Sequence, residues 1–293
     1  MNTTAYKFVL AIDGSAHANR AAGYLVRHAA KLRACEVHVV NVLAPRLAGL
    51  LNAEQQSLIL ESGAETEVAR RMLDAEGIAY RFHSEFGDPA ERIVEIARAE
   101  GAHEIIVGSR GMSALDSLAV GSVAYKVVHL SPLPVTVGPN PTDSRDFEPP
   151  GNRAAHRILL AADGSDAGVR AARYVCAQAQ ARVPVEVRLL NVQIPIASGN
   201  VRRFVSQEMI DNYCRSEGEL ALAGAKQVLQ AADVAFKEDI QTGHAGEVIV
   251  REAAERCCSR IVMGTRGMGA LANIILGSTA LQVLHRSELP VTL

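Results

Sequence analysis

The sequence predicts an α/β protein of two tandem domains, each a doubly wound, five-stranded parallel sheet with helices on both faces. Two observations support this prediction. Apolar strand-like runs alternate with helical segments, which is typical of parallel sheets covered on both sides. The pattern also occurs twice, because residues 105–137 and 261–293 are identical at 17 of 33 positions. We therefore expect domains at 1–140 and 154–293, joined by a polar, proline-containing linker at 141–153.

The elements of the first half follow from local patterns. Ser15 is suited to cap a helix that runs to about Leu32, and residues 52–76 show helical spacing with good helix formers. Asp88-Pro89 opens a helix, and Gly121-Ser122 opens the last one. Apolar or alternating runs predict strands at 6–12, 36–43, 79–85, 103–107 and 133–137. The second half repeats the strands at 157–162, 185–192, 234–241, 259–263 and 289–293.

Five strands of this kind suit a flavodoxin-like or Rossmann-like sheet with strand order 3-2-1-4-5. Ligands of such sheets bind at the carboxyl ends of the strands where the winding direction reverses, here strands 1 and 4. Asp13-Gly14-Ser15 ends the first strand, and the segment Gly108 to Gly111 ends the fourth. The most unusual residues of the sequence are therefore expected where the architecture places a ligand.

The segments Gly108–Ser122 and Gly264–Ser278 share the spacing Gly-x2-Gly-x9-Gly-Ser. Each follows an apolar strand and ends at the start of a helix. Glycines let the backbone approach an anion closely, and a helix N-terminus offers unpaired N–H groups. We expect Ser122 and Ser278 to present an N-cap hydroxyl and a backbone N–H to phosphate oxygens.

These motifs resemble the universal stress protein family in its tandem form. The resemblance rests on Asp-Gly-Ser after the first strand of each half, the glycine spacing, the Gly-Asp-Pro helix opening at Gly87 and the closing Leu-Pro-Val-Thr strand. It covers both halves apart from the linker, and the glycine pattern is that of the ATP-binding branch. The resemblance therefore implies an ATP-binding protein of the stress response.

The resemblance also implies roles for individual residues. Asp13 and Asp163 would contact the adenine or ribose, and the backbone of Val42 and Val192 would meet the adenine edge. ATP would be bound together with Mg²⁺, which its phosphates would hold. Arg110 and Arg266 lie in the glycine loops and are either neighbours of the phosphates or solvated cations. The phosphates would lie on Gly108, Gly111, Gly121, Ser122 and Val123 in the first half, and on Gly264, Gly267, Gly277, Ser278 and Thr279 in the second.

Asp116 departs from the second copy, which has Ala272. A carboxylate there either repels a triphosphate and weakens the first site or points outward from an exposed loop. Whether one or both sites fill with nucleotide stays open at this stage.

Two further functions compete with nucleotide-dependent regulation by a protein partner. The first is a slow ATPase or phosphotransferase, although the sequence has no P-loop lysine and no catalytic set that repeats in both halves. Neither catalytic residues nor a metal site in the protein are expected. The second is a nucleotide-independent interaction module. The net charge of −2 without a basic stripe argues against nucleic-acid binding.

The apolar runs are only as long as strands, so no membrane span is expected. No export leader is recognised and the five cysteines are scattered, which predicts a cytoplasmic protein. The fifth strands are apolar edges, and exposed apolar edges tend to pair. We therefore expect the halves to form an intramolecular pseudo-dimer through Leu133–Val137 and Leu289–Leu293. Homodimerisation of the whole chain stays open.

Overall fold

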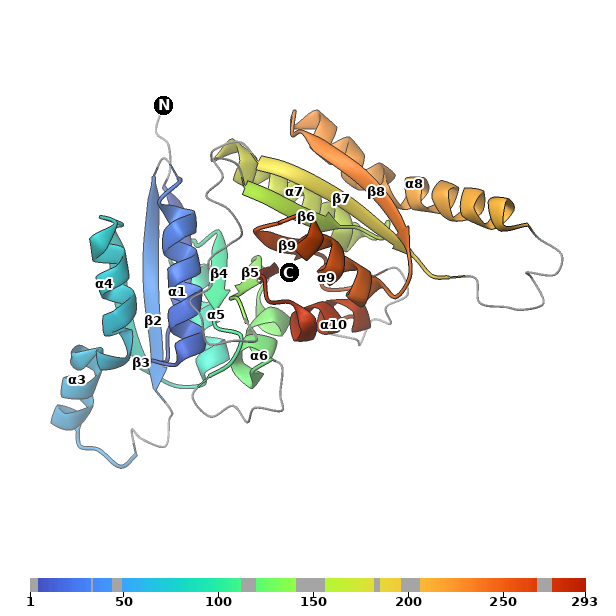
Figure 1. Cartoon of the computed structure of the whole chain (residues 1–293). Coiled ribbons are helices and arrows are strands. Elements are labelled where there is room, and N and C mark those ends of the chain that lie inside the picture. Colours follow the sequence, from blue (N-terminus) through green and yellow to red (C-terminus); the bar gives the residue numbers. More distant parts are fainter. Residues whose placement is uncertain are drawn as a thin grey trace. The chain divides into compact units, whose positions relative to one another are not determined.

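The computed structural model describes residues 5–32, 34–43, 49–111, 120–140, 156–181, 185–195, 206–267 and 276–293. The chain divides into two compact units, which are described one at a time (Figure 1). Unit 1 comprises Met1–Phe147 and Glu288–Thr292, and unit 2 comprises Glu148–Ser287 and Leu293. The expected linker at 141–153 lies outside the described residues.

The sheet of unit 1 has the strand order β3-β2-β1-β4-β5-β10. Its strands are β1 (Tyr6–Ala11), β2 (Cys35–Leu43), β3 (Tyr80–Phe86), β4 (Glu104–Val107), β5 (Val135–Val137) and β10 (Val291–Thr292). The first five are parallel in the predicted order 3-2-1-4-5. Strand β10 adds to this unit and runs antiparallel to β5.

Unit 2 keeps four strands in the order β9-β6-β7-β8, all parallel. These are β6 (His156–Ala161), β7 (Val185–Gln193), β8 (Phe236–Thr242) and β9 (Arg260–Met263). The segment 289–293 provides β10, whose Val291 pairs with Val137 of β5, as expected for the two apolar segments 133–137 and 289–293. The expected pseudo-dimer concerns the arrangement of the two units and stays a prediction.

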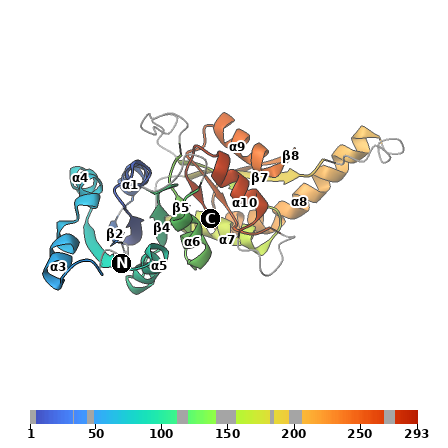
Figure 2. The same cartoon turned by 90° about the horizontal axis from the view of Figure 1, so that it is seen from below.

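Helices cover both faces of the sheet in unit 1. They are α1 (Ala16–Ala29), α3 (Ala53–Ser62), the 3₁₀ turn η1 (Ala64–Thr66), α4 (Glu67–Ala75), α5 (Pro89–Ala99) and α6 (Ser122–Leu130). Helices α1 and α4 lie on one side of the strands, and α5 and α6 lie on the other (Figure 2). The α1 side buries Phe8, Leu10 and Leu25 completely.

The helices of unit 2 are α7 (Asp166–Gln180), α8 (Gln207–Ala231), α9 (Ala245–Glu255) and α10 (Ser278–Arg286). Leu222 and Leu229 of α8 and Val175 of α7 pack on Leu160 and Leu189 of the sheet in one apolar cluster. Helix α9 contacts β6, β7 and α10. No helix among the described residues is long and apolar enough to span a bilayer.

Local capping confirms two predicted helix starts. The Ser15 hydroxyl accepts a hydrogen bond from the Ala18 N–H at 3.1 Å, and the Asp88 carboxylate accepts from Ala90 and Glu91. Such side-chain acceptors satisfy first-turn N–H groups that have no partner within the helix. These two starts were therefore readable from sequence alone.

The predicted single helix at 52–76 is broken in two. Gly63 ends α3 with φ of 52°, in the left-handed region, and η1 separates it from α4. A Cβ at Gly63 would lie 2.9 Å from Phe82 Cζ, so the turn also packs closely against β3. The corresponding α8 of unit 2 runs without interruption for 25 residues.

One asparagine in each unit fixes the end of the first strand. Asn41 Nδ2 donates to the Ile12 carbonyl at 2.8 Å, and Asn191 Nδ2 donates to the Ala162 carbonyl at the same distance. Both side chains are buried. This bond holds the chain turn before Asp13 or Asp163 against the neighbouring strand.

We expect Asn191→Ala to destabilise the protein more than Asn41→Ala. Asn191 Oδ1 also accepts from Gln193 Nε2 at 2.7 Å, whereas Asn41 Oδ1 is buried and has no hydrogen-bond partner among the described residues. Each buried group left without its partner costs about 1–3 kcal/mol. Urea denaturation followed by circular dichroism measures the difference. An equal or larger loss for Asn41→Ala would contradict this reading.

Candidate functional site

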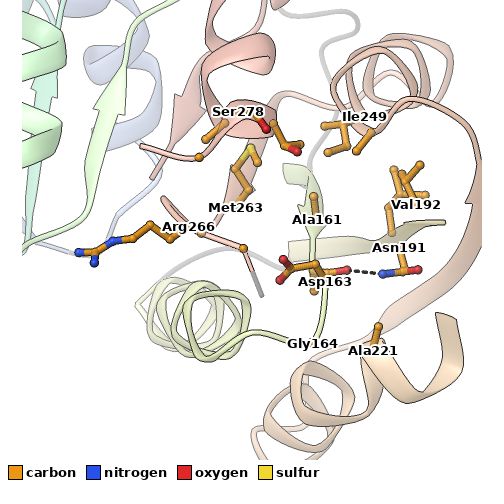
Figure 3. Close-up of a pocket in the computed structure, with 18 of the residues that line it drawn as sticks. Ala161, Asp163, Gly164, Asn191, Val192, Ala221, Ile249, Met263, Arg266 and Ser278 are labelled. Atoms are coloured by element: carbon orange, nitrogen blue, oxygen red, sulfur yellow. Dashed lines mark hydrogen bonds between the residues drawn. The ribbon is translucent and has the colours of Figure 1, made fainter. Parts of the chain in front are cut away.

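A cavity of about 980 Å³ opens in unit 2 at the carboxyl ends of β6 and β9 (Figure 3). All eight residues that the sequence analysis selected in the second half line this cavity. They are Asp163, Val192, Gly264, Arg266, Gly267, Gly277, Ser278 and Thr279. The cavity therefore lies at the predicted switch point of the sheet, where the loops after its two central strands separate.

The glycine loop after β9 lies very close to the turn after β6, because its glycines have no side chains. A Cβ at Gly267 would lie 2.5 Å from Asp163 Oδ2, and one at Gly264 would lie 2.6 Å from the Ala167 Cβ. Asp163 Oδ1 accepts from the Ser165 N–H at 3.1 Å, which fixes the carboxylate at the turn. Only glycine fits both positions without displacing these neighbours.

The start of α10 forms another wall of the cavity. Gly277 is the N-cap residue, with extended backbone, and Ser278 is the first helical residue. The Gly277 N–H donates to the Thr265 carbonyl at 2.8 Å, so the loop and the helix start form one unit. Among the described residues, no side chain caps α10.

The expected N-cap roles of Ser122 and Ser278 were wrong. In both units the glycine before the serine has the extended conformation that an N-cap requires, and the serine already has its place in the helix. No side chain among the described residues competes for the N–H groups of the first turn. These groups and the positive end of the helix dipole suit an anion.

The remaining walls of the cavity are largely apolar. Met263, Ile249 and Leu276 are buried, whereas Ile194 and Leu220 remain 81% and 70% exposed at its border. The sequence analysis missed these residues. Glu217, Leu220 and Ala221 have the spacing of one helix face in α8, which was the available signal.

Arg266 is exposed, and its side chain extends away from the other labelled residues (Figure 3). This orientation agrees with a solvated loop cation, the alternative that the sequence analysis left open.

Unit 1 brings most of the equivalent residues together. A Cβ at Gly111 would lie 2.8 Å from Asp13 Oδ2, and one at Gly121 would lie 3.1 Å from the Arg110 Cα. A Cβ at Gly108 would lie 2.8 Å from the Ala18 nitrogen. The loop after β4 therefore contacts the turn after β1 much as in unit 2.

The other predicted residues of unit 1 lie on two elements. Ser122 and Val123 begin α6, where both are exposed, and Val42 lies in β2 opposite Glu85 of β3. Asp116 lies outside the described residues.

The two units differ beside the turn after the first strand. The Glu65 Cβ of unit 1 would lie 3.3 Å from a Cβ at Gly14. An offset of 156 positions pairs the buried Leu73 of α4 with the buried Leu229 of α8, and it pairs Glu65 with Ala221, which lines the cavity. Unit 1 therefore has a carboxylate-bearing side chain near Asp13 where unit 2 has a methyl group.

The positions of the cysteines, and of the histidines at the ends of α6 and α10, fit a structural role. All five cysteines are free, and burial raises the pKa of the Cys258 thiol to about 12. A thiol with that pKa stays protonated and unreactive at neutral pH. His129 and His285 lie in the last turns of α6 and α10, where a cation suits the helix dipole.

Comparison with known proteins agrees with this geometry. The family model described as "Universal stress protein family" matches residues 6–139 and 154–293. A universal stress protein of Mycolicibacterium smegmatis is 23% identical over 99% of this chain and 97% of its own. Universal stress protein YxiE of Bacillus subtilis is 30% identical over 45% of this chain and 97% of its own.

Among solved structures, a universal stress protein from Archaeoglobus fulgidus superposes with a TM-score of 0.63 at 23% identity. The match covers 98% of this chain and 94% of that one. Protein PA1789 from Pseudomonas aeruginosa superposes with a TM-score of 0.60 at 16% identity, covering 99% and 92%. At these identities the likeness concerns the fold.

The fold and the site together define a tandem α/β protein whose glycine loops lie at the carboxyl ends of the central strands. With both halves matched by one family model, the chain belongs to the universal stress protein family.

We expect Gly264→Ala to destabilise unit 2 by about 1–3 kcal/mol, because its methyl group would overlap the start of α7. Gly277→Ala is the matched control. Its Cβ would lie 3.4 Å from the Thr265 carbonyl oxygen, which is ordinary contact, so its cost stays below about 1 kcal/mol. Thermal unfolding measures both variants. A Gly264→Ala protein as stable as the wild type would show that the close packing is not a constraint.

Proposed function

We propose that this chain is an ATP-binding regulatory protein of the stress response, and that unit 2 holds the nucleotide. Occupancy would change the conformation of the cavity walls or the surface offered to a protein partner. The observation that supports this proposal most is that one cavity brings together all eight residues selected from the second half.

The polar and apolar residues of the cavity would suit different parts of a nucleotide. The Asp163 carboxylate accepts hydrogen bonds, which suits the two hydroxyl groups of a ribose. The exposed apolar side chains of Ile194 and Leu220 would be covered by a base, which removes apolar surface from water. Val192 lies beside them on β7.

The phosphate end of the nucleotide would lie on the glycine loop and the start of α10. Gly264 and Gly267 leave no side chain between an anion and the backbone, and the first turn of α10 has no side-chain cap among the described residues. Mg²⁺ would be carried by the phosphates. No residue described in the cavity is assigned as its ligand.

The affinities of the two units should differ. Glu65 adds a negative charge near the turn after β1, and Asp13 already supplies one there. These negative charges would repel a negatively charged triphosphate. We therefore propose that unit 1 binds ATP more weakly than unit 2, for a reason that is independent of Asp116.

Asp163→Ala should weaken Mg-ATP binding by about ten- to hundredfold, the effect of about 1.5–3 kcal/mol from lost hydrogen bonds to a charged group. Asp13→Ala is the matched control and should leave the tightest binding event unchanged. Isothermal titration calorimetry on the full chain measures both. If the protein takes up no Mg-ATP, it is better described as a nucleotide-independent interaction module.

The exchange of one residue between the units tests the asymmetry. Glu65→Ala should increase the affinity of the weaker site, and Ala221→Glu should decrease that of the tighter site, each by about tenfold or less at a partly solvated position. Both changes lie outside the glycine loops. Calorimetry at two salt concentrations measures the effects, which should shrink as the ionic strength rises. No change in either variant would remove Glu65 from the explanation.

A further inference from the structure

Three potential metal ligands meet in unit 1, away from the glycine loops. They are His38 on β2, His83 on β3 and Glu100 at the end of α5. One ligand atom from each lies within 4.8 Å of the others. His38 Nδ1 is 3.0 Å from His83 Nε2 and 3.8 Å from Glu100 Oε2.

The register of the sheet places these groups on one face. Val40 of β2 lies opposite His83 of β3, and His38 shares the face of Val40 because side chains alternate along a strand. Glu100 is the C-cap residue of α5, which packs on β2 and β1. The His38 side chain is completely buried, whereas His83 and Glu100 remain partly exposed.

Two imidazoles and a carboxylate are a ligand set that Zn²⁺ accepts, with a fourth position for water. A tetrahedral ion about 2.0–2.1 Å from two nitrogens separates them by about 3.3–3.4 Å. The observed separations of 3.0 Å and 3.8 Å lie on either side of that value. Small side-chain rotations would therefore complete the geometry.

The surroundings of His38 lower the pKa of its imidazole. Burial lowers its pKa most, and His83 and Lys7 lower it further, against the opposing effect of Glu100 and Glu36. The lowered pKa favours the neutral imidazole, the form that binds metals.

The second nitrogen of His38 lies near a carboxylate. His38 Nε2 is buried without a hydrogen-bond partner among the described residues and lies 4.0 Å from Glu36 Oε1. A metal on Nδ1 would fix the proton on Nε2, and Glu36 Oε1 would have to move closer than 4.0 Å to accept it. Glu36 itself is paired with Arg81 at 2.7 Å, which keeps it in place.

Lys7 opposes a cation here. Its ammonium donates to the Glu100 carbonyl at 2.9 Å, so a positive charge lies near the cluster. The Glu100 carboxylate offsets that charge as a direct ligand.

Unit 2 shows that the fold does not require these residues. The aligned positions hold Arg188, Asp239 and Arg256. Arg256 donates to Asp239 Oδ2 at 2.6 Å and to Glu252 Oε2 at 3.2 Å. The same location is therefore filled by ion pairs in one unit and by three metal-ligating side chains in the other.

We propose that His38, His83 and Glu100 form a binding site for a divalent transition-metal ion of the Zn²⁺ type. The ion would join β2, β3 and the end of α5, and it would do so independently of nucleotide.

Calorimetric titration of the tag-free, nucleotide-free full chain with ZnCl₂ tests this site, with MgCl₂ as the comparison ion. We expect one Zn²⁺ per chain and no comparable uptake of Mg²⁺. His83→Gln and Glu100→Gln should each lower the affinity at least about tenfold. His129→Gln, an exposed histidine on α6, is the matched control and should bind as the wild type does.

The double variant His83→Asp with Glu100→Arg separates metal binding from folding. It introduces the Asp239–Arg256 pair of unit 2 at the aligned positions, so we expect a folded protein by circular dichroism that no longer takes up Zn²⁺. Wild-type protein that fails to bind Zn²⁺ would overturn the proposal. Binding by His83→Gln and by the double variant at wild-type affinity would place the ion elsewhere and overturn it equally.

Discussion

The candidate site depends on two close approaches that glycine alone allows. In one, backbone lies against backbone, and in the other, backbone lies against a carboxylate. Gly264 lies against the start of α7, and Gly267 lies against Asp163. The Thr265 carbonyl between them accepts from Gly277 and so connects the loop to α10. A side chain at Gly264 would push the loop away from the start of α7, and one at Gly267 would displace the Asp163 carboxylate. This packing holds the glycine loop at the end of β6, where the loop forms a wall of the cavity.

Local sequence signals predicted the parts of this arrangement that depend on near neighbours. Apolar patterning predicted the parallel strand order β3-β2-β1-β4-β5, and turn chemistry predicted the caps at Ser15 and Asp88. Both signals depend only on residues close together in the sequence. The eight residues of the second half could be placed together because parallel strands end at one edge of a sheet.

The features that sequence could not predict depend on distant contacts. The helix at 52–76 breaks at Gly63, where the turn packs against Phe82 of β3, and helical spacing alone gives no sign of that contact. The glycine N-cap of α10 was missed because serine is the more common cap.

Duplication gave the chain two copies of one scaffold with different side chains in equivalent places. The asparagine that fixes the first strand is the same in both units, as is the contact of the glycine loop with the first turn. Glu65 and Ala221 differ beside that turn, and the His38 cluster of unit 1 is replaced by ion pairs in unit 2. The shared residues maintain the fold, and the differing ones are where the chemistry of the two units diverges.

Hydrogen–deuterium exchange of the full chain with and without Mg-ATP tests the central claim most directly, because it reports where the nucleotide binds. The account predicts slower exchange in peptides that cover residues 161–165, 264–267 and 276–280, where the first strand, the glycine loop and α10 meet. The peptides that cover the equivalent segments of unit 1 should change less at the same ATP concentration. Unchanged exchange in all three segments, or protection that is stronger in unit 1, would contradict it.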